Sequence, residues 1–157
     1  MHYSAGLRFL PAPVPAATLL CLVIAIHDGD TLSIRCGTPG PYRVERVRLA
    51  AIDAPEHRQA FGQRARQNLA RLCFRLQARI TPVGRDPYAR TVAHVHCRGE
   101  NAARAQVRAG LAWVYTPAAR ENPQLVALQR QARASSTGLW SQPRPQAPWN
   151  YRRRHPR

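Results

Sequence analysis

Four of the eight carboxylates in this 157-residue chain lie in two short segments, although the chain carries 24 basic residues. The segments are Asp28–Thr31 and Ile52–Glu56, and Arg48 precedes the second of them. Carboxylates held close together repel one another, so such a cluster is unfavourable unless a cation or a reaction uses it. We therefore expect the two segments to form a metal-dependent site for an anionic substrate.

Hydrolysis of a phosphodiester is a reaction that these residues could carry out. The reaction needs an activated water, an in-line approach and neutralisation of the charge that grows on the phosphoryl oxygens. A hard cation held by carboxylates and a main-chain carbonyl can bridge the substrate and the water. Asp30 and Asp53 are the candidate side-chain ligands of that cation. The alternative is that they are turn or helix-cap residues, where aspartate is common.

Glu56 is the candidate general base. It lies three residues after Asp53, and Pro55 stiffens the backbone between them, so its carboxylate could reach a water beside the cation. The alternative is that Glu56 stabilises the start of the helix that is expected to follow it.

The overall charge predicts a polyanionic partner. The formal net charge is +16 and the pI is about 11.5. Nucleic acid is the most direct candidate because attraction to phosphates does not depend on base sequence. The positive charge is carried by arginine, whose planar guanidinium suits phosphate oxygens better than an ammonium group does. The alternative is that the charge only keeps the protein soluble.

The four cysteines allow two disulfide bonds. A hairpin over residues 19–36 would bring Cys21 and Cys36 face to face, close enough for a disulfide, and Cys73 and Cys97 could form a second. The spacing does not fit a structural zinc site. Disulfides predict an oxidising compartment, so we expect a secreted or periplasmic protein, with reduced cysteines in a cytoplasmic protein as the alternative.

The length suits one compact domain and is too short for two. Residues 1–17 resemble a leader or signal segment, although prolines interrupt its apolar part. Residues 18–141 form the expected domain, and residues 142–157 form a basic tail, rich in Pro and Arg, that we expect to be loosely attached. The apolar run Leu19–Ile26 is too short to span a membrane, and no membrane association is expected.

Hydrophobic periodicity predicts a mixture of strands and helices. The expected strands cover residues 19–26, 31–36, 42–52, 78–83 and 90–97. The expected helices cover residues 61–76, 101–109 and 122–136. This order predicts an α+β fold that is mainly β, a small five-stranded barrel with about three helices packed around it.

Five separated motifs occur in order along the chain. They are Asp28-Gly29-Asp30-Thr31, Arg48-Leu49 with Ile52-Asp53-Ala54-Pro55-Glu56, Asp86-Pro87-Tyr88-Ala89-Arg90, Gly110-Leu111-Ala112-Trp113, and Gly138-Leu139-Trp140. Any one motif would be a weak signal, but together they make residues 18–140 resemble the staphylococcal nuclease (thermonuclease) family. The resemblance implies an OB-fold barrel with flanking helices, in agreement with the order of elements above.

The resemblance also implies a ligand set. Asp30, Asp53 and the main-chain carbonyl of Ala54 would bind Ca²⁺. Ala54 stands where the type enzyme of the family has threonine, which keeps the carbonyl and loses a hydroxyl. Pro87 replaces a basic residue and Ala89 replaces a glycine, and both changes could alter the grip on the substrate without removing a catalytic group.

Arginine and tyrosine side chains complete the predicted site. At their motif positions, Arg48 and Arg90 would hold the phosphate and stabilise the transition state. Tyr88 and Tyr115 are candidate contacts for a terminal phosphate or a stacked base. The alternatives are a solvated surface position for either arginine and a half-buried core position for either tyrosine.

The resemblance implies a Ca²⁺-dependent endonuclease with little sequence specificity. Cleavage of DNA, and by expectation of RNA, would occur at the 5′ oxygen and leave 3′-phosphate ends. We expect a monomer without an obligate protein partner. One alternative is a non-catalytic nucleic-acid-binding module on the same barrel, which would have no need of Asp30, Asp53 and Glu56 together. A basic structural or partner-binding protein would explain the charge but not the acidic segments.

Overall fold

The computed structural model describes residues 17–37 and 40–157. The predicted leader, residues 1–17, lies outside the described residues except for residue 17. The described part therefore covers most of the predicted domain and the whole of the basic tail.

Five strands form a closed barrel, as the sequence predicts. They are β1 (Leu19–Asp28), β2 (Thr31–Cys36), β3 (Arg43–Leu49), β5 (Gln77–Arg85) and β6 (Thr91–Cys97). The strands pair in the order β3-β2-β1-β5-β6, and parallel pairing between β3 and β6 closes the barrel. A short strand β7 (Glu100–Asn101) continues the sheet beside β6. Alternating side chains such as Val23, Leu32 and Val95 fill the interior.

Three main helices flank the barrel, and these are the ones expected from periodicity. They are α1 (Gly62–Cys73), α2 (Ala102–Arg108) and α3 (Pro123–Ala134). Helix α1 buries one stripe, Ala65, Leu69 and Cys73, at the helical spacing of three to four residues. Two 3₁₀ helices, η1 (Thr116–Glu121) and η2 (Gly138–Ser141), flank α3. In the described residues, no helix is both long enough and apolar enough to cross a membrane.

The predicted third strand, residues 42–52, is divided in two. Strand β3 ends at Leu49, and Ala51 adopts a left-handed backbone conformation with φ of 71°. The chain then enters β4 (Ile52–Asp53), which pairs with β8 (Trp113–Val114) instead of continuing in the barrel. Alternation of apolar residues does not report a change of partner strand, so the sequence pattern predicted one strand where the structure has two.

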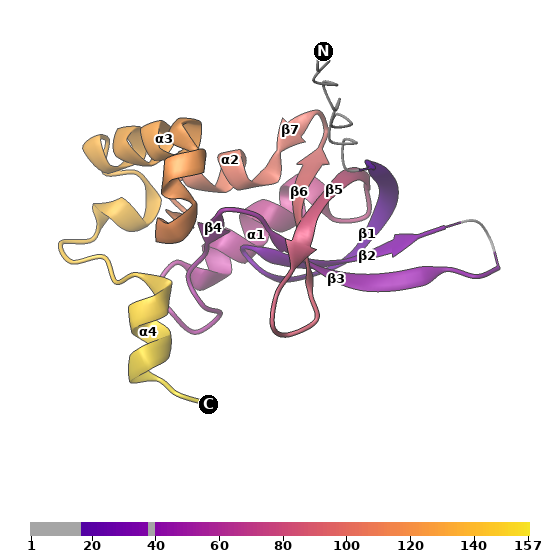
Figure 1. Ribbon diagram of the computed structural model, residues 1–157. Coiled ribbons are helices and arrows are strands. Elements are labelled where there is room, and N and C mark those ends of the chain that lie inside the picture. The colour runs from indigo at the N-terminus through magenta and orange to yellow at the C-terminus, as the bar shows by residue number, and fades with distance from the viewer. Residues whose placement is uncertain (1–16, 38–39) are drawn as a thin grey trace, which may run out of the picture.

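The basic tail is ordered in part, contrary to the expectation of loose attachment. It contains a short helix α4 (Pro148–Arg154), which begins with proline at its first position. Ala147 and Pro148 are buried, and the ring of Trp149 meets the ring of Trp113 edge-on at 5.6 Å between centroids. Apolar contacts that composition alone does not reveal therefore hold the tail on the domain. Figure 1 shows α3 and α4 at the opposite end of the molecule from the β2–β3 hairpin.

The predicted disulfide between Cys21 and Cys36 is present, and so is the second one, between Cys73 and Cys97, which the spacing left open. Cys21–Cys36 joins β1 to β2, with 4.6 Å between Cα atoms. Cys73–Cys97 joins the end of α1 to the end of β6, with 5.3 Å between Cα atoms. No free cysteine remains among the described residues.

Candidate active site

Asp30 lies in the turn between β1 and β2, immediately before the first residue of β2. Its side chain is buried, with 4% of the residue exposed. One carboxylate oxygen accepts a hydrogen bond from the main-chain N–H of Ala54 at 2.7 Å, and the other accepts one from the Thr31 hydroxyl at 2.9 Å. These contacts fix the direction of the carboxylate and tie the β1–β2 turn to the segment that contains Asp53.

Close packing holds this turn in place. A Cβ atom on Gly29 would lie 2.5 Å from the Cβ of Ala65 in α1 and 2.9 Å from that of Ala54, so only glycine fits there. The fully buried Gln106 of α2 donates hydrogen bonds to the carbonyl of Gly29 at 2.6 Å and to that of Ala65 at 2.8 Å. One side chain therefore connects the turn to two helices.

Arg48 joins the two acidic segments. Its guanidinium lies 2.9 Å from Asp30 Oδ2 and 3.3 Å from Asp53 Oδ1, and it also donates to the carbonyl of Ile52 at 3.1 Å. Asp53 lies on β4 and is 1% exposed. Two buried carboxylates thus share one largely buried arginine at the junction of β2, β3 and β4.

Burial and the neighbouring charges shift the pKa values of the groups in this cluster. Burial raises the pKa of Asp30 above its usual value, and the Arg48 guanidinium and the Ala54 N–H offset only part of that rise. Burial alone would lower the pKa of Arg48, but Asp30 and Asp53 outweigh it, so this pKa is raised. Burial also raises the pKa of the nearby Asp28, with further contributions from Asp30 and Glu56.

Glu56 lies at the edge of the same cluster, on the connection between β4 and α1. Its main-chain N–H donates to the side-chain carbonyl of Gln59 at 3.1 Å, and its own carbonyl accepts from the Gln59 N–H at 2.9 Å. Gly62, the first residue of α1, packs so tightly on the carbonyl of Glu56 that an added Cβ would overlap it. The backbone of Glu56 is held firmly, while its side chain is 24% exposed.

A residue that sequence reasoning did not single out also reaches the cluster. Arg152 of α4 donates to both carboxylate oxygens of Asp53, at 3.1 and 2.7 Å, and to Glu56 at 2.9 Å. The run Arg152–Arg154 lies in the basic tail that the sequence predicts. Nothing in the run indicates which arginine would turn inward, or that it would meet carboxylates.

Arg90 and Tyr88 lie on the hairpin between β5 and β6. Arg90 pairs with Asp86, and its guanidinium lies 5.5 Å above the centre of the Tyr88 ring, which is on a residue 79% exposed. In the described part of the chain, no hydrogen bond or ion pair joins Arg90 to the carboxylate cluster. The next residue, Thr91, is the first residue of β6 and pairs with Val47 of β3. The β6 end of the hairpin loop therefore lies beside the strand that carries Arg48.

Tyr115 follows β8. Its main-chain N–H donates to the carbonyl of Ala51 at 2.9 Å, and the residue is 46% exposed. Tyr115 therefore lies beside the β3–β4 turn, because Ala51 is in that turn, two residues before Asp53. The structure brings Asp30, Arg48 and Asp53 into contact. The link between Tyr115 and this group is the hydrogen bond from its main-chain N–H to the Ala51 carbonyl.

The oxygens at this site suit a hard cation. Asp30 and Asp53 present two buried carboxylates, and Ala54 is anchored to Asp30 by its N–H, which keeps its peptide next to both. No group of three or more His, Cys, Asp or Glu side chains that could hold a metal occurs in the described residues. A hard cation held by these two carboxylates and the Ala54 carbonyl would have its remaining coordination positions open to water and substrate oxygens.

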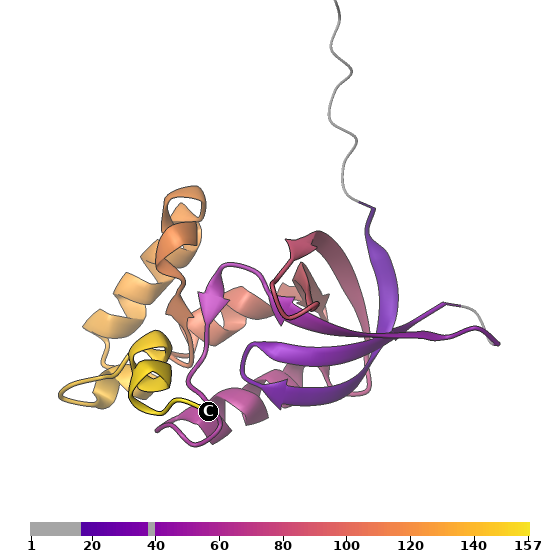
Figure 2. The same cartoon turned by 60° about the horizontal axis from the view of Figure 1, so that its bottom comes forward.

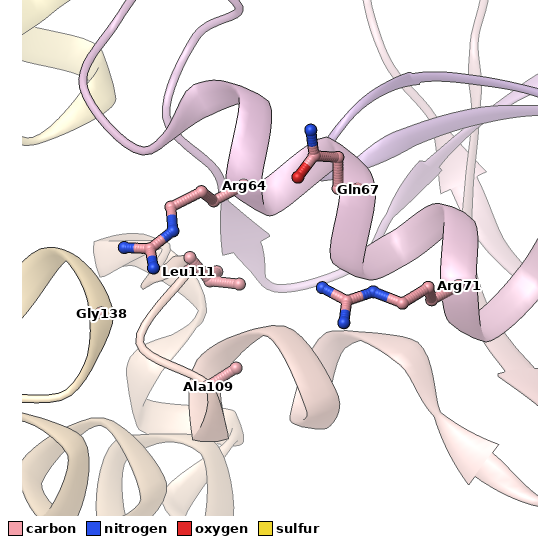
Figure 3. Close-up of a pocket in the computed structure, with 6 residues that line it drawn as sticks. All are labelled: Arg64, Gln67, Arg71, Ala109, Leu111 and Gly138. Carbon is pink, nitrogen blue, oxygen red and sulfur yellow. The ribbon is translucent and has the colours of Figure 1, made fainter.

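A separate hollow of about 270 Å³ lies between α1 and the segments that follow α2 and α3. It is lined by Arg64, Gln67, Arg71, Ala109, Leu111 and Gly138. Figure 3 shows the side chains of Arg64 and Arg71 extending from α1 toward this space. None of the predicted site residues lines it.

Comparison with known proteins identifies the family to which the chain belongs. A family model described as staphylococcal nuclease homologue matches residues 46–142. Protein ParB of Escherichia coli is 39% identical over 164 residues, covering 98% of this chain and 90% of that protein. Micrococcal nuclease of Shigella flexneri is 38% identical over 141 residues, covering 83% and 79%. An uncharacterized endonuclease of Haemophilus influenzae is 39% identical over 133 residues, covering 85% and 72%. The chain belongs to the staphylococcal nuclease homologue family.

Proposed function

We propose that this nuclease is a Ca²⁺-dependent endonuclease that cleaves DNA and RNA with little sequence preference and leaves 3′-phosphate ends. The observation that supports it most directly is the contact of Arg48 with both Asp30 and Asp53, two carboxylates that are almost fully buried. Buried acids in a chain of net charge +16 are hard to explain by stability alone.

Each residue of the site has a role in this proposal. Asp30, Asp53 and the Ala54 carbonyl would hold Ca²⁺, which when bound polarises the phosphoryl group and the attacking water. Glu56 accepts the proton of the water, because its partly exposed carboxylate adjoins Asp53 on a fixed backbone. Arg48 donates to the phosphoryl oxygens from inside the site, and Arg90 approaches from the β5–β6 hairpin after exchanging Asp86 for the phosphate. Tyr88 and Tyr115 contact the flanking nucleotide.

The experiment is a cleavage assay with single-stranded DNA, double-stranded DNA and RNA, each with Ca²⁺, with Mg²⁺ and with a chelator. We expect loss of full-length substrate with Ca²⁺ and intact substrate with the chelator. Products should accept a 5′ label from polynucleotide kinase without prior phosphatase treatment and should resist 3′ extension until the 3′-phosphate is removed. DNA that is retarded on a gel but intact in every tube would instead indicate a binding module.

We also propose that the protein is a monomer that works outside the cytoplasm. Two disulfides support this location, because such bonds persist in oxidising compartments. Intact mass before and after reduction and alkylation, measured on protein recovered from each cell fraction, tests the location, and light scattering during gel filtration tests the oligomeric state. Fully reduced cysteines in protein from its native compartment would contradict the proposed location.

A further inference from the structure

The side chain of Arg152 occupies the carboxylates to which the proposed function assigns the cation and the general base. Its two terminal nitrogens bond both oxygens of Asp53, and one of them also bonds Glu56. Figure 2 shows α4, in yellow, beside the connection between β4 and α1. Glu56 belongs to that connection, because β4 ends at Asp53 and α1 begins at Gly62. Residue 152 is 99 positions from residue 53 along the chain, so only the tertiary fold creates this contact.

A cation and this guanidinium compete for Asp53. Asp53 Oδ1 already lies 3.3 Å from Arg48, and Arg152 engages Oδ1 and Oδ2 together. A divalent cation bound to either oxygen would lie a few ångströms from a positive charge, in a partly buried site where repulsion is weakly screened. The bidentate pairing is also strong enough to compete, because charge-assisted, two-point contacts are the strongest class of hydrogen bond.

The rest of α4 is held lightly. Pro148 is its one buried residue, Trp149 touches Trp113 edge-on, and the side-chain amide of Gln59 donates to the carbonyl of Gln146 at 2.6 Å just before the helix. The Arg152 side chain is 44% exposed, so water can replace its contacts as it leaves. A seven-residue helix is unstable in isolation, so α4 can be released at modest cost.

We propose that α4 is an autoinhibitory strap: Arg152 covers Asp53 and Glu56 in the free protein and must withdraw before the cation binds. The inference rests on the proposed function, because it needs Asp53 to be a cation ligand. The apparent dissociation constant of the cation is then the intrinsic constant divided by the fraction of molecules in which Arg152 has withdrawn. Nucleic acid favours release too, because its phosphates attract the freed arginines of α4.

The test measures Ca²⁺ affinity by isothermal titration calorimetry, without substrate. The variants are Arg152→Ala and Arg152→Lys, with Arg153→Ala and Arg154→Ala as matched controls, since these exposed arginines on the same helix lose the same charge. We expect Arg152→Ala to bind Ca²⁺ about ten-fold more tightly than the wild type, corresponding to a wild-type population about one-tenth released. Arg152→Lys should lie between the two, because an ammonium cannot make the two-point contact. The controls should match the wild type.

Amide hydrogen exchange over residues 148–154 gives a second readout that does not depend on activity. In the wild type, Ca²⁺ should speed exchange in this segment, as Arg152 withdraws and α4 loosens. Arg152→Ala should exchange fast with or without Ca²⁺. Asp53→Asn, which removes the proposed ligand, should show no response to Ca²⁺.

The outcomes separate this inference from the function beneath it. Equal or weaker Ca²⁺ binding by Arg152→Ala, in a variant whose circular dichroism is that of the wild type, overturns the strap while Ca²⁺-dependent cleavage stands. Absence of Ca²⁺ binding in the wild type and in Arg152→Ala overturns the proposed cofactor and the strap together. Tighter binding by Arg152→Ala alone, with faster exchange in wild-type α4 on addition of Ca²⁺, supports the strap.

Discussion

Arg48 and Arg152 divide the contacts of three carboxylates between them. Arg48 is largely buried and bridges Asp30 and Asp53, whereas Arg152 reaches in from a half-exposed position and bridges Asp53 and Glu56. A buried cation between two buried acids is costly to remove, because each acid would be left uncompensated. We therefore propose that Arg48 is a permanent part of the site and that Arg152 is a removable one.

Replacement of Glu56 by Gln removes the proposed proton acceptor while keeping its shape. We expect turnover on single-stranded DNA at saturating Ca²⁺ to fall about 10²–10⁴-fold, the usual contribution of a positioned base. Arg90→Ala should cost about 10²–10³-fold, as expected for one donor to a developing charge. Glu121→Gln, a change at an exposed carboxylate, is the control. Near-wild-type rates in folded Glu56→Gln or Arg90→Ala would refute the role assigned to that residue.

Gly62 tests how tightly the backbone of Glu56 must be held. A Cβ at Gly62 would overlap the Glu56 carbonyl, so Gly62→Ala should shift that carbonyl and lower turnover at saturating Ca²⁺ about ten-fold or more, since misplacement by about 1 Å can cost 10²-fold. Gly84→Ala is the matched control, because its added Cβ meets nothing within 4 Å. The same initial-rate assay measures both, and equal rates for the two variants would contradict the prediction.

At the scale of elements, two motifs that contain no acidic residue support the strand of Asp53. They are the motif that begins at Gly110 and the motif that begins at Gly138. The N–H of Leu139 donates to the carbonyl of Gly110 at 2.8 Å, and the rings of Trp113 and Trp140 lie 4.5 Å apart between centroids. Trp113 is on β8, directly opposite Asp53 on β4. The two motifs therefore form one support for the short strand that carries Asp53.

Gln106 of α2 makes buried hydrogen bonds to two other elements. Its amide nitrogen serves carbonyls in the β1–β2 turn and in α1, and its oxygen accepts from Asn68 of α1 at 2.7 Å. Gln106→Leu would leave these buried groups unpaired, so the free energy of unfolding should fall by about 2–5 kcal/mol, measured by urea titration. Gln131→Leu on the exposed face of α3 should change it by less than about 0.5 kcal/mol. Similar midpoints for the two variants would contradict this linking role.

At the scale of the whole molecule, charge is separated by location. The chain carries a net charge of +16, yet Asp30 and Asp53 are buried. The basic charge attracts a polyanion over long distances, and in the proposed function the acidic cluster would supply a place for a cation where that polyanion meets the protein. The positive electrostatic field of the protein opposes the binding of a cation. Withdrawal of Arg152 would reduce that opposition at Asp53.

Nucleic-acid affinity should depend steeply on salt. If about four phosphates are neutralised, raising NaCl from 50 to 200 mM should weaken the binding of a single-stranded oligonucleotide about 50-fold. Fluorescence anisotropy in the presence of a chelator measures this without cleavage. Affinity that is unchanged over this range would contradict an electrostatic mode of binding.

Local pattern in the sequence was sufficient for the barrel strands, the three main helices and the membership of the acidic cluster. These features depend on periodicity and on motifs a few residues long, which are written in consecutive residues. The tertiary structure alone decided that β4 leaves the barrel for β8, that the Gly110 and Gly138 motifs meet, and that Arg152 is the arginine that reaches Asp53. With 24 arginines in the chain, no local spacing distinguishes one from another, and only the three-dimensional path of the backbone selects which of them meets a buried acid.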